Sequence, residues 1–454
     1  MLYQSHKREY QMLALFKNFF KKRSFYEGAK ITTLNKDFLR SNTQDFEELV
    51  RLDRKTLRAR ARWLHENNAI MANIDKTILN NVIGQGITLQ SKTGNKKIDD
   101  EIEEKFKEWV KVCDITNRIN FYDLQRVMLE NRMVDGEIFI YKKLTKDKYH
   151  PFKIQMIESD YIDETSGING VEVDEFGAVK GYYFRPKNTF KTIFVKNEDV
   201  INYFRLERPT QYRGISEYKQ AIMDLKNFMA FNSSLIAAVR ARANIAYVVK
   251  SNSPQHSFTD EEYENLTTIN GLSVFYLNAN EDIVKLDPDI VSGEYKPFVE
   301  VVIRMLSSAR NISYELAYRD FSKVNFSSAR ASIIQDNKRF ENEQKHLIDY
   351  VLTPIFEEWL EVNVMAGNFK SIKPHIFINN RKKFIKPTWI RPAREWVDPL
   401  KDIKAIQMEL DLGLTTRSEV IASKGKDFEE ILIQRQKEEE LIKKYNLNST
   451  TKEK

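Results

Sequence analysis

The feature that most constrains the fold is a long amphipathic segment between residues 215 and 245. Its apolar and small residues recur in alternating steps of three and four, as in a helical heptad. The members of this seam are Ile222, Leu225, Met229, Ile236, Val239 and Ala243, with Asn232 completing the spacing. The spacing predicts one long helix whose seam packs against other helices. Packing within the chain and packing between neighbouring copies both remain open.

The segments before this helix change from helical to β-rich. Residues 46–82 have the leucine and alanine spacing of a helix, which Gly84-Gln85-Gly86 would end, and a strand is expected to begin at Ile87. Residues 97–135 predict two more helices. Residues 136–205 hold short runs rich in Val, Ile, Phe and Tyr between turn residues, which predicts strands.

The segments after the long helix are mainly helical. Residues 253–292 form a small mixed segment, and helical patterns return over 294–312 and 327–352, the latter interrupted by Pro354. A charged helical region follows. The polar tail 446–454 is expected to be disordered. Taken together, these patterns predict an α+β fold.

Composition limits the cellular setting. The 454 residues carry 72 Lys and Arg against 65 Asp and Glu, a formal net charge of +7, which is compatible with nucleic acid but does not demonstrate it. A single cysteine, Cys113, excludes a disulfide within the chain, favours the cytosol and is expected to be an inert packing residue. We find no signal-peptide cleavage site and no apolar run of membrane-spanning length, so no membrane contact is expected.

The catalytic motifs that we tested favour no enzyme. A phosphate-binding Walker A loop and zinc-ligand spacing are both absent. The carboxylates of Asp135-Gly136-Glu137, and of Glu158, Asp160, Asp163 and Glu164, could hold Mg²⁺, but turns beside strands explain them better. Ser327 or Ser328 is interpreted as a helix cap and not as a nucleophile. We therefore predict no catalytic residue, no metal and no cofactor.

Several segments in a fixed order carry a family resemblance. They are Arg58-Ala59-Arg60-Ala61-Arg62 with Asn67-Asn68, Val82 to Ile87, Asp135-Gly136-Glu137, Ile157 to Asp160, Gly170 to Asp174, Arg208 to Ser216, Asn311 to Glu315, Asn325 to Ala331, Trp396 to Lys401 and Gly413 to Glu419. Each is weak alone. Together, in this order over about residues 40–430, the segments make the chain resemble the portal proteins of lambda-type bacteriophages. Thr210 stands where this family is expected to have glycine.

The resemblance implies a portal-like fold with a mixed α/β wing, long stem helices, a small α/β clip and a helical C-terminal crown. On this chain the implied parts are a peripheral N-terminal arm 1–39, the wing 40–213, the stem helices 214–248 and 294–312, the clip 249–293, a channel loop 313–326, the long wing helix and wing return 327–399, the crown 400–445 and the tail 446–454.

The resemblance also implies function. Portal subunits form a ring, usually of twelve, at one vertex of the virion capsid, and double-stranded DNA passes non-specifically through its channel during packaging and ejection. Implied partners are the terminase large subunit, major capsid and scaffold proteins, and head-completion or tail-connector proteins. The protein would be made in the bacterial host cytoplasm. Alternative interpretations are a Mg²⁺-dependent nucleic-acid enzyme that uses the carboxylates above, and a scaffolding or adaptor protein.

Channel-facing charges can be proposed within this scheme. Lys219, Lys226 and Arg240 are separated by seven and fourteen residues, so they share one face of a continuous helix. The implied channel loop adds Arg319 and Lys323. A solvated outer face explains the same charges equally well, since charge runs often mean no more than that.

Overall fold

The computed structural model of the chain describes residues 43–187, 189, 191–250, 268–269, 272–277, 295–322, 325–393 and 399–445. The predicted arm 1–39, the tail 446–454, most of the clip, and Lys323 of the channel loop lie outside the described residues. The described chain mixes helices with several small sheets, as the predicted α+β class requires. None of its helices is long and apolar enough to cross a membrane.

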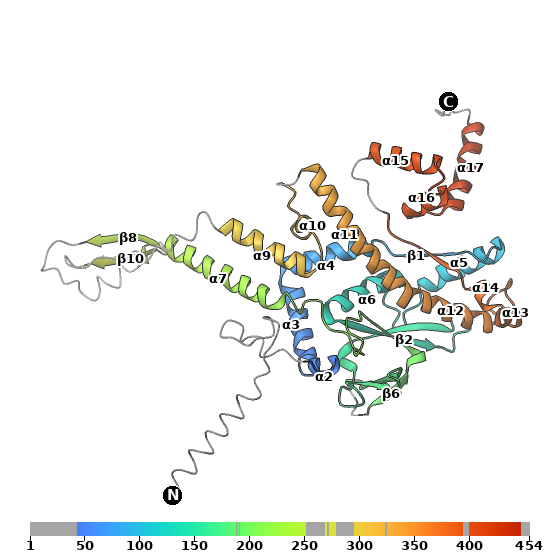
Figure 1. Ribbon diagram of the computed structural model, residues 1–454, viewed down its shortest axis with the longest axis horizontal. Coiled ribbons are helices and arrows are strands. Elements are labelled where there is room, and N and C mark those ends of the chain that lie inside the picture. Colours follow the sequence, from blue (N-terminus) through green and yellow to red (C-terminus); the bar gives the residue numbers. More distant parts are fainter. Residues whose placement is uncertain are drawn as a thin grey trace, which may run out of the picture.

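The first half of the chain builds much of the body of the molecule, from which a pair of long helices projects (Figure 1). The region 46–82, predicted as helical, is divided where Asn68 ends one helix and its side chain accepts from Ile70 N and Met71 N at 3.1 Å to begin the next. The two helices predicted over 97–135 are present, capped by Asn95 and Asn120. These helices are α2 (Phe46–Val50), α3 (Arg54–Asn67), α4 (Ala69–Val82), α5 (Lys96–Val110) and α6 (Phe121–Asp135).

The β-rich region forms strands as predicted, and the structure shows that they pair antiparallel. One three-stranded sheet has β2 between β3 and β7, and a second has β5 between β4 and β6. The strand expected after the Gly84–Gly86 turn, β1, pairs with β11 from the far end of the chain. The strands are β1 (Thr88–Ser91), β2 (Glu137–Leu144), β3 (Phe152–Ile157), β4 (Val171–Val173), β5 (Val179–Phe184), β6 (Ile193–Lys196), β7 (Val200–Phe204) and β11 (Pro387–Ile390).

The second half carries the long helices. The long helix predicted over 215–245 is α7 (Ile222–Asn244), and it leads into a small sheet of β8 (Ile245–Lys250), β10 (Leu272–Leu277) and β9 (Thr268–Ile269). The chain returns along α9 (Tyr295–Ala309). It continues through α10 (Tyr314–Tyr318), α11 (Phe326–Leu347), α12 (Thr353–Met365), α13 (Pro374–Asn379) and α14 (Arg381–Phe384) to α15 (Pro399–Asp411), α16 (Arg417–Ser423) and α17 (Phe428–Lys444).

Two local predictions around α11 were wrong. Asn325, and not Ser327 or Ser328, caps the helix, because its side chain accepts from Ser328 N at 2.8 Å. Pro354 does not interrupt the helix: a π-helical turn at Ile348–Leu352 joins α11 to α12, and Pro354 stands at the start of α12, where a missing N–H costs little.

Aromatic side chains from distant segments form the centre of the main core. The ring of Phe106 lies 5.0 Å from that of Trp359 and 5.8 Å from that of Phe121, and Trp109 Nε1 donates to the carbonyl of Phe152 at 2.7 Å. Cys113 is buried in the same core, and burial raises the pKa of its thiol to about 12. Such a thiol stays protonated, in agreement with the predicted packing role.

Candidate functional site

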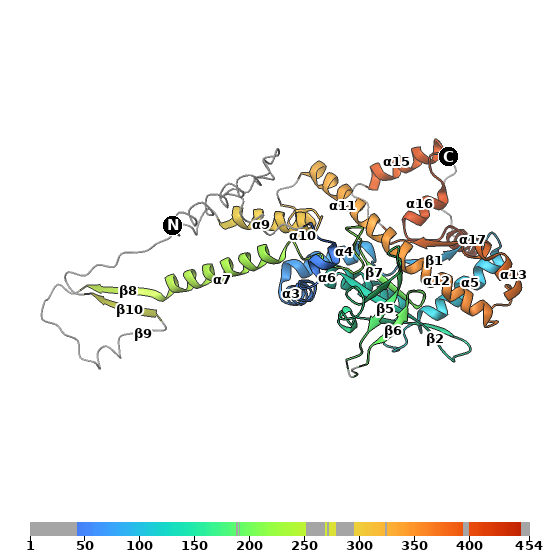
Figure 2. The same cartoon turned by 60° about the horizontal axis from the view of Figure 1, so that its bottom comes forward.

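The helices α7 and α9 form an antiparallel pair that extends away from the body in both views (Figures 1 and 2). Aromatic contacts join them: the rings of Phe231 and Phe298 lie 4.7 Å apart, and Tyr295 Oη donates to Asn232 Oδ1 at 3.1 Å. At the inner end, Ile303 and Leu306 of α9 are fully buried. We call this pair the stem helices.

The predicted seam of α7 divides into two halves with different surroundings. Ile222 and Leu225 are 5% and 0% exposed, so the inner half belongs to the chain's own core. Ile236 and Val239 are 52% and 46% exposed. The outer half therefore presents large apolar side chains that the described chain leaves mainly in contact with solvent.

The same pattern continues on α9. Phe298, Val301 and Met305 are 42%, 55% and 53% exposed, although they belong to a strongly amphipathic helix. Near the base of α7, an open groove of about 730 Å³ is lined by Trp63, Met223 and other residues of α3 and α7. Apolar surface therefore extends along the stem and onto α3.

The charges predicted to face a channel have different surroundings. Lys219 lies in the turn before α7 and not on the helix, and its ammonium group is paired with Glu207. Lys226 and Arg240 are both exposed on α7, where Lys226 borders the groove. Arg319 is exposed at the end of α10, with a left-handed φ of 58°. Lys323 lies outside the described residues. Whether any of them faces a channel stays a prediction.

Buried ion pairs fix the base of both stem helices to the body. Glu217 precedes α7 and Arg310 follows α9, and their side chains meet at 2.9 Å. Arg310 also reaches Asp75 of α4 at 2.8 Å. Arg132 of α6 bridges Glu217 to Glu343 of α11, with both distances 2.8 Å. This junction therefore ties the stem helices to three helices of the body.

The arginines of the junction favour the ionised form of Glu217. Burial alone would raise the pKa of Glu217, but the charges of Arg132, Arg310 and Arg339 outweigh it and hold that pKa well below its usual range. At the edge of the junction, hydrogen bonds to Asp75 and Glu130 raise the pKa of His65 to about 10. His65 is therefore charged at neutral pH and adds a cation beside Asp75.

A second buried pair joins two segments of the family resemblance. Arg213 Nε donates to Glu137 Oε1 at 2.7 Å, and Gly214 N donates to Glu137 Oε2 at 2.9 Å. The side chains of Arg213 and Glu137 are both fully buried. Arg54 of α3 donates to the carbonyl of Gly214 at 3.1 Å, so the start of the stem segment is also tied to α3.

The carboxylates that could have held Mg²⁺ are paired with arginines. Asp135 accepts from Arg62 Nε at 2.7 Å, and Arg62 also reaches Asp160 at 2.6 Å. Asp163 accepts from Arg185 at 2.6 Å. Within the part of the chain that the structure describes, no three His, Cys, Asp or Glu residues come together as a metal site. These carboxylates therefore act as ion-pair partners that join structural elements.

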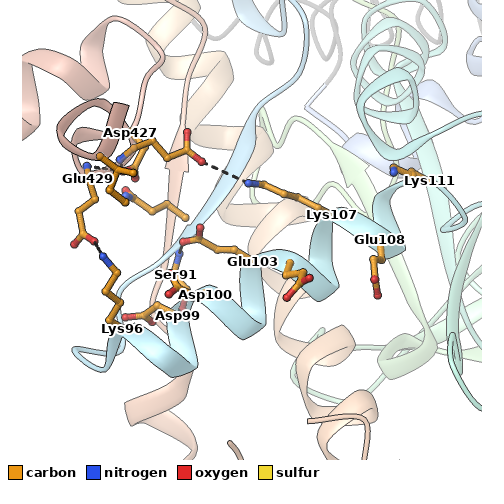
Figure 3. A pocket seen from close by; sticks show the side chains of 14 residues that line it. Ser91, Lys96, Asp99, Asp100, Glu103, Lys107, Glu108, Lys111, Asp427 and Glu429 are labelled. Atoms are coloured by element: carbon orange, nitrogen blue, oxygen red, sulfur yellow. Dashed lines mark hydrogen bonds and ion pairs between the residues drawn. The ribbon is translucent and has the colours of Figure 1, made fainter. Parts of the chain in front are cut away.

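A cleft between α5 and α17 is rich in charge (Figure 3). Lys96 pairs with Glu429 at 3.1 Å and Lys107 with Glu430 at 3.6 Å, and all four side chains are well exposed. Asp99 and Glu103 accept hydrogen bonds from Ser91. Exposed pairs of this kind contribute at most about 1 kcal/mol each, so α17 is held only weakly against α5.

Comparison with known proteins assigns the chain. The sequence pattern described as phage portal protein, lambda family, matches residues 34–344. The chain therefore belongs to the phage portal proteins, and among them to the lambda family. This confirms the family predicted from the ordered motifs and, with it, a portal function at a capsid vertex.

Two relatives that match along most of the chain are named as portal proteins. The probable portal protein of Halomonas phage phiHAP-1 is 25% identical over 441 residues, covering 89% of this chain and 84% of that protein. Portal protein B of Escherichia phage lambda is 20% identical over 439 residues, covering 84% and 82%. A chain in the neck of an empty gene transfer agent particle aligns with a TM-score of 0.44 and 11% identity over 81% of this chain and 92% of its own.

Sequence reasoning missed the junction residues. Asp75, Glu217, Arg310 and Glu343 come from four separate segments, and none of them belongs to a catalytic motif. The available signal was their position in the sequence, because Glu217 lies shortly before α7 and Arg310 directly follows α9.

Proposed function

We propose that copies of this chain assemble side by side into a ring, of twelve subunits as in the family resemblance, around a channel for double-stranded DNA. The observation that carries this proposal is the divided seam: the inner half of α7 is anchored in the body, and the outer half exposes Ile236 and Val239. Apolar side chains left exposed on a rigid helical pair are suited to packing against a neighbouring copy.

The parts of the chain then take the roles that the resemblance implies. Residues 40–213 with 327–399 form the wing, α7 and α9 the stem, 249–293 the clip, and α15 to α17 the crown. The clip would receive the terminase large subunit and later the head-completion or tail-connector proteins. Scaffold and major capsid proteins would meet the wing and crown. The finished ring would reside in the virion after synthesis in the host cytoplasm.

The assembly proposal predicts a separation between folding and ring formation. Replacing both Ile236 and Val239 with Asp places charge on a surface that the single chain already exposes, so the subunit should fold. Rings should be lost, because burying those charges between copies costs about 2–5 kcal/mol per site. Electron microscopy and native mass spectrometry of the purified protein measure the outcome. An adaptor protein would show no ring with a central hole even as wild type.

Matched variants make this test specific. Leu144→Asp with Phe176→Asp changes two exposed side chains of the body, 63% and 87% exposed, and should leave rings intact. Leu225→Asp alters the buried half of the seam and should impair folding itself. Normal rings from the Ile236 and Val239 double variant would refute assembly through the outer seam.

The channel proposal predicts a defect in DNA handling without a defect in assembly. Lys226→Glu with Arg240→Glu changes two exposed cations of α7. Each subunit would then repel phosphates, so nuclease-protected DNA in heads built with the variant should fall by at least about tenfold. Lys180→Glu with Lys191→Glu makes the same change of charge on exposed residues of the wing and should have little effect. Wild-type packaging by the stem variant would favour a solvated outer face for these charges.

A further inference from the structure

A long stretch near the end of the wing lacks acidic residues. The 33 residues from Val362 to Arg394 contain eight Lys and Arg and no Asp or Glu. At the average composition of this chain, with 65 acidic residues in 454, a stretch of that length would hold about five. The stretch therefore has a strong positive charge within a sequence that is otherwise nearly balanced.

The fold turns these cations outward from a fixed base. Phe377 of α13 and Phe384 of α14 are buried, at 1% and 5% exposure, with their rings 5.8 Å apart. Backbone N–H groups of Lys370 and Ser371 donate to Glu101 of α5 at 2.6 and 2.9 Å. The helices α13 and α14 are thus held on the body, at the end opposite the stem in both views (Figures 1 and 2).

The exposed lysines of this surface have no ion-pair partner among the residues that the structure describes. Arg381 is paired with Glu361 at 3.1 Å and lies 3.6 Å from Glu357, both on α12. No ion pair joins the other cations to a carboxylate of the described residues. These exposed cations are Lys370, Lys373, Lys382, Lys383 and Lys386. We call the exposed part of α13, α14 and their flanking residues the α13–α14 surface.

Apolar side chains are exposed among these cations. Ile376 and Ile378 are 42% and 65% exposed and stand on either side of the buried Phe377. Phosphate contacts are made by cations and hydrogen-bond donors, and isoleucine adds nothing to them. The combination of unpaired lysines with exposed isoleucines therefore favours a partner that carries both acidic and apolar groups.

We propose that the α13–α14 surface docks an acidic, amphipathic segment of a partner protein. Carboxylates of the segment would pair with Lys382, Lys383 and the neighbouring lysines, and its apolar side chains would cover Ile376 and Ile378. Complementary charge speeds the encounter and selects the partner, while apolar contact makes the complex less sensitive to salt than charge alone. The surface lies far from the stem helices, so docking there leaves the outer seam and the channel charges free.

Fluorescence anisotropy on the full-length protein tests this proposal. The probe is a labelled 20-residue peptide of glutamates with a leucine at every third or fourth position, and a 24-base-pair DNA duplex serves as the competing ligand. Lys382→Glu with Lys383→Glu should weaken peptide binding by at least about tenfold. Ile376→Ser with Ile378→Ser should weaken it by at least about threefold and leave duplex binding unchanged.

Controls separate this surface from general charge and from misfolding. Lys180→Glu with Lys191→Glu alters the net charge equally and should change peptide affinity by less than about twofold. If α14 does not tolerate its two changes, Lys373→Glu with Lys386→Glu tests the same surface from outside that helix. Ring formation is measured for every variant, so a loss of peptide binding by normal rings concerns this surface and not the proposed portal assembly.

Two outcomes would overturn the proposal. Absence of saturable peptide binding by the wild-type protein would show that the surface does not select such a segment. Tighter binding of the duplex than of the peptide, weakened by Lys382→Glu with Lys383→Glu but unaffected by the isoleucine variant, would identify a phosphate-binding surface for nucleic acid instead.

Discussion

Gly136→Ala is expected to abolish folding or to lower the free energy of unfolding by about 4 kcal/mol or more. Gly136 ends α6 with a φ of +98°, a conformation that strains any residue with a Cβ. A Cβ at this position would also lie 2.3 Å from the carbonyl carbon of Ile215, which is backbone and cannot rotate away. The measurement is soluble yield, followed by thermal and urea unfolding of whatever protein is recovered.

Gly94→Ala is the matched control, because Gly94 has a similar φ of +85° but nothing within 4 Å of an added Cβ. That variant should cost only the backbone strain, about 1 kcal/mol. The difference between the two variants therefore isolates the close approach of Gly136 to Ile215. Equal destabilisation of both would show that the two segments are not held in tight backbone contact.

The close approach explains why two short motifs of the family resemblance belong together. Gly214 faces Gly136 from the other side, and a Cβ on Gly214 would lie 2.1 Å from the carbonyl oxygen of Gly136. Glu137 and Arg213, the neighbours of these glycines, form the buried ion pair. The sequence showed both motifs, but a contact between residues 77 positions apart has no local signal.

Hydrophobic periodicity predicted where the long helix forms, but it did not predict what covers each part of that helix. The seam spacing correctly predicted a long helix at α7, because side chains at steps of three and four lie on one face whatever covers them. The same spacing could not show that Leu225 is covered by the chain's own body and Ile236 is not. That distinction depends on where the body ends, which is a property of tertiary structure.

The exact ends of the helices around α11 were difficult to predict, because more than one nearby residue could cap or interrupt a helix. Asn325, Ser327 and Ser328 are all good capping residues, and Asn325, which has an extended backbone, takes the cap position. At Pro354, the helix continues: the π-helical turn at Ile348–Leu352 leads directly into α12, and Pro354 lies in the first turn of α12. Sequence patterns alone rank these alternatives poorly, since each is acceptable locally.

The order of the motifs predicted the family, but nothing in the sequence predicted the junction of buried ion pairs at the base of the stem helices. The ordered motifs over about residues 40–430 predicted, without any single strong signature, the family that the comparison confirms over residues 34–344. The junction could not be found in this way, because Arg132, Glu217 and Arg310 look like ordinary surface residues in a sequence with 30% charged residues. Burial gives them their role, and burial is not visible before the chain is folded.

Arg310→Met is expected to destabilise the protein by about 3–5 kcal/mol, because it leaves Asp75 and Glu217 buried with fewer cations to pair with. Arg310 stands where α9 rejoins the body, so the stem helices should also lose their fixed orientation. Chemical unfolding measures the first effect. Hydrogen exchange of α7 and α9, with electron microscopy of the rings, measures the second.

A control variant distinguishes the loss of a buried ion pair from the loss of an exposed one. Lys196→Met breaks an exposed pair with Glu198 and should change stability by less than about 1 kcal/mol. Combining Arg310→Met with Asp75→Asn removes one of the stranded carboxylate charges, so the double variant should lose less stability than the two single variants added together. Strictly additive losses would mean that Arg310 and Asp75 do not act as a pair. A stable Arg310→Met protein with normal rings would show that the stem helices are oriented by apolar packing alone, through Ile222, Leu225 and Leu306.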